Sequence, residues 1–535
     1  MSQSGTLPRE HVEHRPERRP HSPLRELFAP LPDLLACGGD LRIDVDPLTG
    51  RNAYGCATQP SEGSAGFASC TASTISPRGY EAAERARTAL MSSAMLHGLI
   101  ECFDARVEAL RDELKNLLGI ARSGAEAIFT ASGSDAQLTV LAISRALLGD
   151  DVTTLVVAAD QTGTATTYTA RGQHFSGRTA NDAAVVRGDN VCGLGAVRSV
   201  AVRLRDADGH LRAASAVDAD ILEQVETIVA EGGRVMLEAM DSSKLGYSAP
   251  SERCLAEIAA RWPGRVQIVI DACQMRLGPA RIAAHLARGA LVLITGSKFY
   301  GGPAFSGAVL VPPQIGARLI AAPLAVGLDD YMTRSDWPAR WTSVREQFRT
   351  APNFGQWLRW EAAIAEMRAY HAVPEVFRRS AMRALGSGLA RLITASPSLR
   401  LVPALVQVDR DDEFALPSIF AFTLQRNGRA LDLKQCRATY TALTTDDAPS
   451  IVPDAFTSPS LIGQPVGWGG PADDRVAALR MCIGARHIID AWSAPSSATD
   501  ETLSLILDNA ADVVARIETL LSQPDTQLTA RNVHA

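Results

Sequence analysis

One lysine stands where chemistry would explain its presence better than packing. Lys298 follows an apolar stretch and lies in the sequence ITGSKFYGGPAFSG, residues 294–307. A lone lysine at a strand end is usually a surface cation. Here, however, small residues and glycines surround it and would leave room for a bound group. The flexible stem also allows the amine to reach a carbonyl carbon and form a Schiff base. Lys298 is therefore the first candidate for a catalytic residue.

A carboxylate and an amide follow the preceding apolar stretch. The sequence VIDACQ places Asp271 and Gln274 at the end of a predicted strand, 27 residues before Lys298. That separation is close to the length of one strand–helix–strand unit. In a parallel sheet, the carboxyl ends of neighbouring strands meet at one edge, where ligands bind. A structural ion pair or a helix cap is the alternative explanation for Asp271.

A third segment has the composition of a phosphate site. TASGSDAQ, residues 130–137, places a glycine and two serines between a predicted strand and a predicted helix. Backbone N–H groups at such a helix start can hold an anion. A simple serine N-cap is the alternative. The candidate residues of this segment are Ser132, Gly133, Ser134 and Asp135.

Together these three segments match the needs of one cofactor. Pyridoxal 5′-phosphate (PLP) needs a phosphate cradle, a carboxylate that keeps its pyridine nitrogen protonated, and a lysine for the Schiff base. Lys298, Asp271 and the 130–137 segment supply these groups. The protonated ring then serves as an electron sink for a carbanion at the α carbon of an amino acid.

The same residues resemble a known family, the fold-type I PLP enzymes, and in particular their aminotransferase class V branch. The segments SGSDA, DACQ and TGSKFYGGPAFSG are similar to that family's phosphate, ring and lysine motifs over roughly residues 80–490. The resemblance implies an internal aldimine on Lys298, with Asp271 at the pyridine nitrogen and Gln274 at the ring hydroxyl. Ser297 stands where the branch usually has histidine, and its hydroxyl can still donate to a phosphate.

Weaker similarities extend the site. RTAPNFG, residues 349–355, resembles a segment whose threonine binds the phosphate of a neighbouring subunit, which implies a homodimer and a role for Thr350. LRMCIGARH, residues 479–487, resembles the strand whose arginine binds the substrate carboxylate. It points to Arg480, with Arg486 as the weaker option. A planar guanidinium suits a carboxylate, but a surface ion pair is the alternative for both arginines.

The cofactor ring has no obvious stacking partner in the sequence. The family places an aromatic ring or a histidine after the strand near residue 158, but here Gln161 or Thr162 falls in register, and the nearest rings are Tyr168 and His174. Residues 31–79 form a long loop rich in small residues. We expect it to cover the site and to bring Tyr54 to the substrate.

The sequence motifs do not decide which reaction the protein catalyses. A transaminase and a side-chain lyase or transferase are both consistent with the motifs. A cysteine desulfurase would need a nucleophilic cysteine near residues 440–470, and none occurs there. A desulfurase-like lyase, or a non-catalytic binding or regulatory protein that keeps the fold, is the alternative.

Alternating strand and helix patterns place these motifs on an α/β domain. Apolar runs typical of buried parallel strands alternate with helical periodicity between residues 110 and 325. The predicted fold class is α/β, a PLP-dependent transferase (aspartate aminotransferase-like) large domain with a smaller C-terminal α+β domain. The predicted divisions are a disordered tail (1–30), an N-terminal loop and helix (31–110), the large domain (111–325), a helical connector (326–399) and the small domain (400–535).

The composition of the chain limits the classes of molecule that it is expected to bind. The 535 residues carry a net charge of −6, which argues against a nucleic-acid binder. We see no membrane span and no signal peptide. Nine scattered cysteines without zinc spacing predict no metal site and fit a reducing cytoplasm. A small amino-acid substrate is the partner that this sequence favours.

Overall fold

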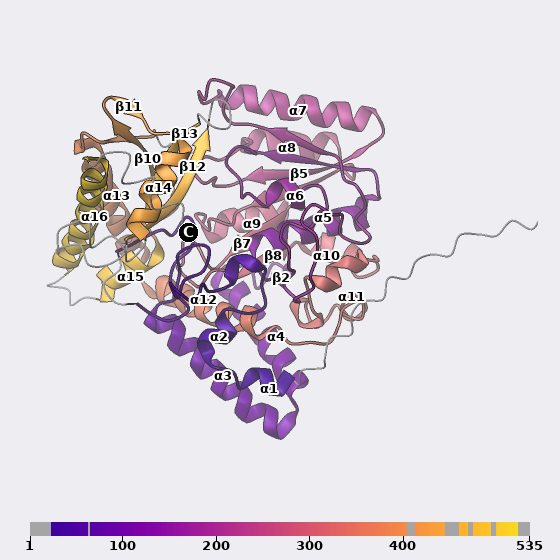
Figure 1. The fold of residues 1–535 in the computed structure, drawn as a ribbon. Coiled ribbons are helices and arrows are strands. Elements are labelled where there is room, and N and C mark those ends of the chain that lie inside the picture. Colours follow the sequence, from indigo (N-terminus) through magenta and orange to yellow (C-terminus); the bar gives the residue numbers. More distant parts are fainter. Residues whose placement is uncertain are drawn as a thin grey trace, which may run out of the picture.

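The computed structural model describes residues 23–61, 65–403, 412–444, 460–468, 475–493 and 499–522. Its centre is a seven-stranded sheet with the order β2-β8-β7-β6-β5-β3-β4 (Figure 1). The strands are β2 (Glu126–Thr130), β3 (Val152–Val157), β4 (Ser199–Val202), β5 (Arg234–Met240), β6 (Val266–Asp271), β7 (Leu291–Thr295) and β8 (Gly307–Val311). Each neighbouring pair is parallel except the two pairs that β8 makes, which are antiparallel.

Both faces of this sheet are covered, as the apolar runs predict. Along β2, Ala127 and Phe129 join one hydrophobic cluster and Ile128 joins another. This alternation places the two clusters on opposite faces of the sheet. The helices of this domain are α5 (Gly133–Leu148), α6 (Thr166–Thr169), α7 (Ala214–Ala230), α8 (Glu252–Arg261), α9 (Pro279–Ala287) and α10 (Pro313–Leu319).

The N-terminal part departs from the sequence expectation in three places. Helix α1 (Pro23–Leu27) lies within the predicted tail, and its Leu27 is buried. The predicted N-terminal helix is two helices, α3 (Pro77–His97) and α4 (Leu99–Leu117), because Gly98 between them has a φ of 86°. The long loop contains α2 (Leu31–Leu35), η1 (Leu41–Ile43) and β1 (Ala65–Phe67).

The small domain is built around a second sheet, to which the N-terminal segment contributes a strand. Strand β1 pairs in parallel with β12, and the sheet continues β12-β13-β10-β11, with β9 also on β10. Its elements are β9 (Leu399–Leu401), η4 (Glu413–Ala415), β10 (Ile419–Arg426), β11 (Arg429–Ala430), α14 (Leu433–Thr444), β12 (Ser460–Trp468), β13 (Val476–Cys482), α15 (Ala485–Ser493) and α16 (Thr499–Ser522). Residues 62–64 of the predicted loop lie outside the described residues.

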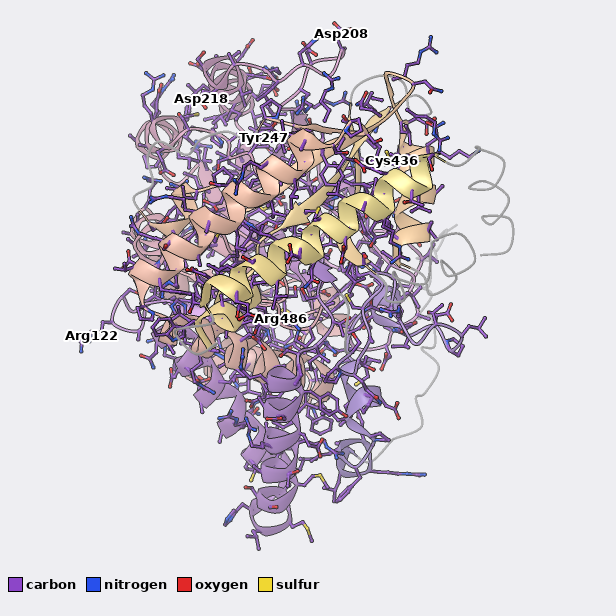
Figure 2. The ribbon with its side chains drawn as sticks, turned by 90° about the vertical axis from the view of Figure 1, so that its left-hand side faces the viewer. Arg122, Asp208, Asp218, Tyr247, Cys436 and Arg486 are labelled. Atoms are coloured by element: carbon purple, nitrogen blue, oxygen red, sulfur yellow. The ribbon has the colours of Figure 1, made fainter. Side chains whose placement is uncertain are left out.

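Long helices connect the two sheets. The connector holds η2 (Val326–Asp330), η3 (Arg334–Asp336), α11 (Thr342–Arg345), α12 (Phe354–Ala372) and α13 (Glu375–Ala395). Helix α12 is almost entirely buried and packs against α3 and α4. Helices α13 and α16 lie side by side on the outer face of the small domain (Figure 2). The predicted architecture, a mainly parallel α/β sheet with a smaller α+β domain, is confirmed. Among the described residues, no helix has the length and hydrophobicity needed to cross a membrane.

Candidate active site

A cavity of about 490 Å³ lies where three parts of the chain meet. Its volume is in the range of small-molecule and cofactor sites. The N-terminal loop contributes Arg42, Tyr54, Cys70 and Thr71; the strand ends and turns of the large domain contribute, among others, Ser132, Gly133, Ser134, Gln161, Thr162, Ser242, Lys244, Asp271, Gln274, Ser297 and Lys298; and the small domain contributes Arg437, Tyr440, Gln464 and Arg480.

The lysine and the DACQ segment converge as the strand order predicts. Strands β6 and β7 are parallel neighbours, so Asp271 at the end of β6 and Lys298 after β7 reach the same cavity. The Asp271 carboxylate is 8% exposed and accepts a hydrogen bond from the backbone N–H of Cys273 at 3.0 Å. The side-chain amide of Gln274 donates to the carbonyl of Cys70 at 3.0 Å. Gln274 therefore ties the N-terminal loop to the edge of the sheet.

The start of α5 is both a capped helix and a cradle. Ser132 is the N-cap and accepts from the N–H groups of Ser134 and Asp135. Asp135 does not line the cavity; it accepts from the Ser132 hydroxyl, and burial, followed by the charge of Asp40, raises its pKa to about 7. The cap that the sequence offered as an alternative is present, and the same turn still faces the cavity.

An arginine that the motifs do not reveal completes this cradle. Arg42 donates to the Ser134 hydroxyl at 3.2 Å and is held by Asp40 through bonds of 2.8 and 2.6 Å. Its guanidinium lies over the rings of Phe175 and Phe305. A cation beside a helix N-terminus strengthens an anion site. No sequence signal separates Arg42 from the other arginines of the chain.

Glycines around the lysine serve packing rather than the cavity, contrary to our expectation. A Cβ on Gly296 would lie 2.5 Å from the Cβ of Ala363, and one on Gly302 would lie 2.6 Å from the same atom. Helix α12 presses against this turn, so these two positions admit no side chain. Gly307 has the same constraint, since its Cβ would lie 2.5 Å from the backbone of Ser132.

Polar side chains occupy the region where the family would stack a ring. Gln161 and Thr162 line the cavity, and Gln161 accepts from the Ser243 hydroxyl at 2.6 Å. The side-chain nitrogen of Gln161 is buried with no partner among the described residues. His174 instead lies 2.6 Å from the Tyr331 hydroxyl, and neither His174 nor Tyr168 lines the cavity.

Arg480 is the buried guanidinium of the site. It lies on β13, is 2% exposed, and donates to the carbonyls of Gln464 at 2.6 Å and Lys244 at 3.2 Å. Its Nε has no partner among the described residues, and it makes no ion pair within that part of the chain. A guanidinium without a carboxylate partner is suited to bind one. Tyr54, the other candidate substrate contact, also lines the cavity, and burial raises the pKa of its hydroxyl.

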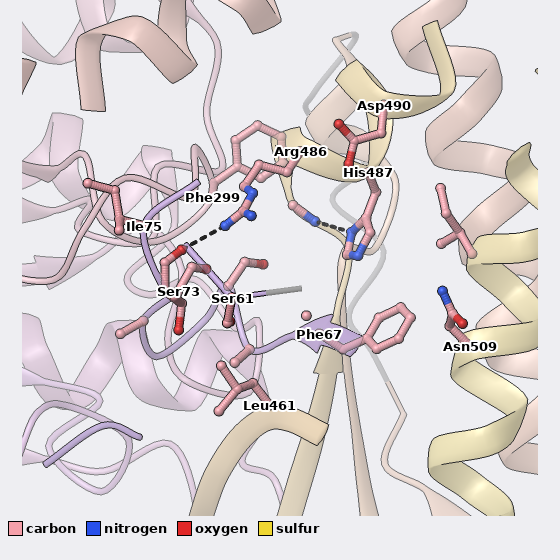
Figure 3. A pocket seen from close by; sticks show the side chains of 18 of the residues that line it. Ser61, Phe67, Ser73, Ile75, Phe299, Leu461, Arg486, His487, Asp490 and Asn509 are labelled. Carbon is pink, nitrogen blue, oxygen red and sulfur yellow. Dashed lines mark hydrogen bonds between the residues drawn. The ribbon is translucent and has the colours of Figure 1, made fainter. Parts of the chain in front are cut away.

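The weaker candidate, Arg486, faces a different cavity. This neighbouring space of about 200 Å³ is lined by Phe67, His487 and Asp490 among others (Figure 3). Arg486 donates there to the carbonyl of Thr74 at 2.8 Å. It does not line the cavity of Lys298.

Two predicted phosphate ligands have different positions. Ser297 lines the cavity directly before Lys298. Thr350 is exposed and is not among the residues that line the cavity of its own chain. Its predicted contact is with a neighbouring subunit, so the role of Thr350 stays a prediction.

Two thiols form a pair at the cavity wall. Cys70 lines the cavity, and its side chain contacts Cys482 of β13. Burial raises the pKa of the Cys70 thiol, but the hydrogen bond from Cys482 and the charges of Arg480 and Arg276 together lower it below its usual value. A Cβ on Gly463 would lie 2.6 Å from the Cys70 sulfur, so a glycine there makes space for the pair. No sequence motif predicts Cys70 at this cavity; the tertiary structure places it there.

A second lysine and a second acid lie close to Lys298 and Asp271. Lys244 lines the cavity, and burial, followed by the charges of Arg480 and Lys298, lowers its pKa to about 7. Glu238 of β5 does not line the cavity and is 2% exposed; burial, followed by the charge of Asp271, raises its pKa to about 8. Glu238 is therefore largely protonated at neutral pH.

Comparisons with known proteins give matches among solved structures alone. No family model matches the sequence, and no curated protein matches it. A NifS-like protein from Rickettsia africae is 11% identical, covering 85% of this chain and 99% of that one, with a TM-score of 0.49. The structure of TDC from Oryza sativa with PLP and tryptamine is 14% identical, covering 81% and 82%, with a TM-score of 0.46. A glutamate decarboxylase domain from Vibrio parahaemolyticus is 14% identical, covering 84% and 80%, with a TM-score of 0.45. At these scores the superpositions identify neither a substrate nor a reaction for this chain.

Proposed function

We propose that this protein is a fold-type I PLP-dependent enzyme that acts on an amino acid. One observation carries the proposal. A single cavity gathers the lysine after β7, the carboxylate at the end of β6 and the helix start after β2, together with an arginine that has no carboxylate partner in the described chain. If the cavity bound no cofactor, three independent capping or packing roles would have to bring these residues together by chance.

The residues present fit the cofactor. A phosphate at this helix start would meet the Ser134 hydroxyl and the guanidinium of Arg42, which Asp40 also binds. It would replace the Ser132 hydroxyl as the acceptor for the N–H groups of Ser134 and Asp135. Asp271 is a buried carboxylate whose charge would hold a proton on the pyridine nitrogen. Gln274 would bind the ring hydroxyl, and Ser297 and Thr162 would complete the contacts. PLP supplies an electron sink when it is bound.

The chain's own residues then have separable tasks. Lys298 would bond the cofactor aldehyde, give way to the substrate amine, and move a proton at the substrate α carbon or at C4′. Arg480 would orient the α-carboxylate. Tyr54 and Thr71 of the N-terminal loop line the cavity and would limit the access of water to it.

Transamination and side-chain elimination or transfer are the reactions that this site suits. Which α-carbon bond breaks depends on its angle to the cofactor ring. A desulfurase-like lyase is a second candidate because Cys70 places a thiol of lowered pKa in the cavity, a position that the 440–470 region does not supply. Thr350 supports a homodimer in which each subunit completes the other's phosphate site.

Cofactor uptake tests the proposal. Purified protein titrated with PLP should develop a visible absorbance band above 400 nm. Lys298→Ala should lose the band, while Lys434→Ala, a control at an exposed lysine, should keep it. A wild-type protein that stays colourless and does not retain PLP on a desalting column would refute the proposed function. Mixing the loaded protein with amino acids, with and without a 2-oxo acid, then separates amino-group exchange from release of a side-chain fragment.

A further inference from the structure

Cationic side chains gather on the side of the cavity that faces the small domain. Lys244 follows β5, Arg480 lies on β13 and Arg437 lies on α14, and all three line the cavity with Lys298. Among the described residues, the amine of Lys244 has no ion pair or hydrogen bond. Like charges that line one cavity are unfavourable unless an anion joins them.

The proposed cofactor does not supply that anion. Its phosphate would lie at the start of α5 with Arg42, on the large-domain side of the cavity. Asp271, the one carboxylate that lines the cavity among the described residues, is assigned to the ring nitrogen. Cys70 is the remaining candidate anion, but the charges of Arg480 and Arg276 already act on its thiol. Within the described residues, one α-carboxylate on Arg480 still leaves the amine of Lys244 without a partner of opposite charge, whereas Arg437 is exposed to solvent.

Lys244 is also placed to share a ligand with Arg480. The guanidinium of Arg480 on β13 donates to the backbone carbonyl of Lys244 at 3.2 Å, and its charge acts on the Lys244 amine. Lys298, Arg480 and Cys70 are the charged or titratable groups that act on the Lys244 amine. Its pKa of about 7 means that an incoming anion would draw a proton onto it.

We propose that the substrate is an amino acid with a second anionic group, and that Lys244 binds this group beside Arg480. This inference rests on the proposed function and specifies its substrate class. The second group is a carboxylate, a sulfinate or a phosphate, since all three accept hydrogen bonds from an ammonium and a guanidinium.

Calorimetric titration tests the substrate class. PLP-loaded protein is titrated with three matched pairs: L-glutamate and L-glutamine, L-cysteinesulfinate and L-cysteine, and O-phospho-L-serine and L-serine. We expect at least one acidic member to bind ten-fold or more tightly than its neutral match. Lys244→Met should reduce that ratio to about one, Lys244→Arg should keep most of it, and Lys434→Met should leave it unchanged. The pair with the largest ratio identifies the second anionic group.

Proton linkage separates recognition from a structural effect. Titrations at pH 8 in buffers of different ionisation enthalpy should show proton uptake on binding to the wild type and none with Lys244→Met. Ratios near one for all three pairs in the wild type, or a ratio that survives in Lys244→Met, would overturn the inference. If the protein takes up no PLP, the proposed function fails, and the same titrations on cofactor-free protein still decide whether Lys244 binds an anion.

Discussion

Glu238 offers a direct test of the electrostatics beneath the site. Its carboxyl group is 2% exposed on the interior strand β5, accepts from the side-chain amide of Gln137 at 2.6 Å, and lies close enough to Asp271 to feel its charge. Burial, and then the charge of Asp271, raises its pKa from 4.5 to about 8. We predict that Glu238→Gln, which keeps the shape and the acceptor oxygen but cannot ionise, stabilises the protein at alkaline pH.

The magnitude follows from proton linkage. Below pH 4.5, the pKa of Glu238 in the unfolded chain, its carboxyl group is protonated in both the folded and the unfolded state and does not change the free energy of unfolding. As the pH rises toward the folded pKa of about 8, the unfolded chain ionises while the folded chain keeps its proton, so stability falls. The loss is about 1.4 kcal/mol per pH unit. Between pH 5.5 and pH 8 the free energy of unfolding of the wild type falls by roughly 3 kcal/mol through this group. Glu238→Gln does not show this loss, because a glutamine does not ionise.

Urea titration of the cofactor-free proteins at these two pH values measures the effect. The stability of Glu238→Gln relative to the wild type should rise by roughly 3 kcal/mol from pH 5.5 to pH 8. Asp135 and Asp336 also have raised pKa values, but they titrate in both proteins and cancel in the difference. Glu257→Gln on the exposed face of α8 is the matched control and should show no such trend. A pH-independent difference for Glu238→Gln would refute the reasoning, because the wild-type carboxyl would then be ionised in the folded protein.

Three further predictions follow from the cavity. Arg42→Gln should weaken PLP binding by about ten-fold or more, because a charged hydrogen bond to phosphate is lost; an unchanged Kd in the absorbance titration would remove Arg42 from the phosphate site. Gly307→Ala should destabilise the protein by about 1–3 kcal/mol, since the added Cβ meets the Ser132 backbone at 2.5 Å; an unaltered Tm would contradict this. Cys70 should be alkylated by iodoacetamide at pH 6 almost as fast as at pH 7, because its lowered pKa keeps it a thiolate. Bound PLP should slow that labelling, as measured by peptide mass spectrometry; a rate that falls ten-fold with the pH would indicate an ordinary thiol.

Much of the large domain was predictable because its signals are local. A short apolar run ending in a polar residue defines a strand and its carboxyl end without reference to the rest of the chain. Parallel order then places Asp271 and Lys298 at one edge, and both line the cavity as expected. The break at Gly98 and the short strand β1 were missed, since a three-residue strand has too little pattern to stand out from a loop.

The residues that face the substrate side were harder to find. Cys70, Arg42 and Lys244 lie in unrelated stretches of sequence, and no spacing rule links them to Lys298. Cys70 and Arg42 reach this cavity because the N-terminal loop crosses from the large sheet to the small one, where β1 pairs with β12, and Lys244 reaches it in the turn after β5. The same fold separates Arg480 from Arg486, which are six residues apart but face different cavities.

The segment ITGSKFYGGPAFSG separates what local sequence patterns predict from what only the tertiary structure decides. By itself, the sequence determined that a lysine follows a buried strand one unit after a carboxylate, because strand, turn and helix preferences act over a few residues. Tertiary structure alone decided why the turn is so rich in glycine: α12, more than 50 residues later, leaves no space for a side chain at Gly296 or Gly302. It also decided which distant cations surround the lysine, because charge and burial depend on contacts that no local pattern records.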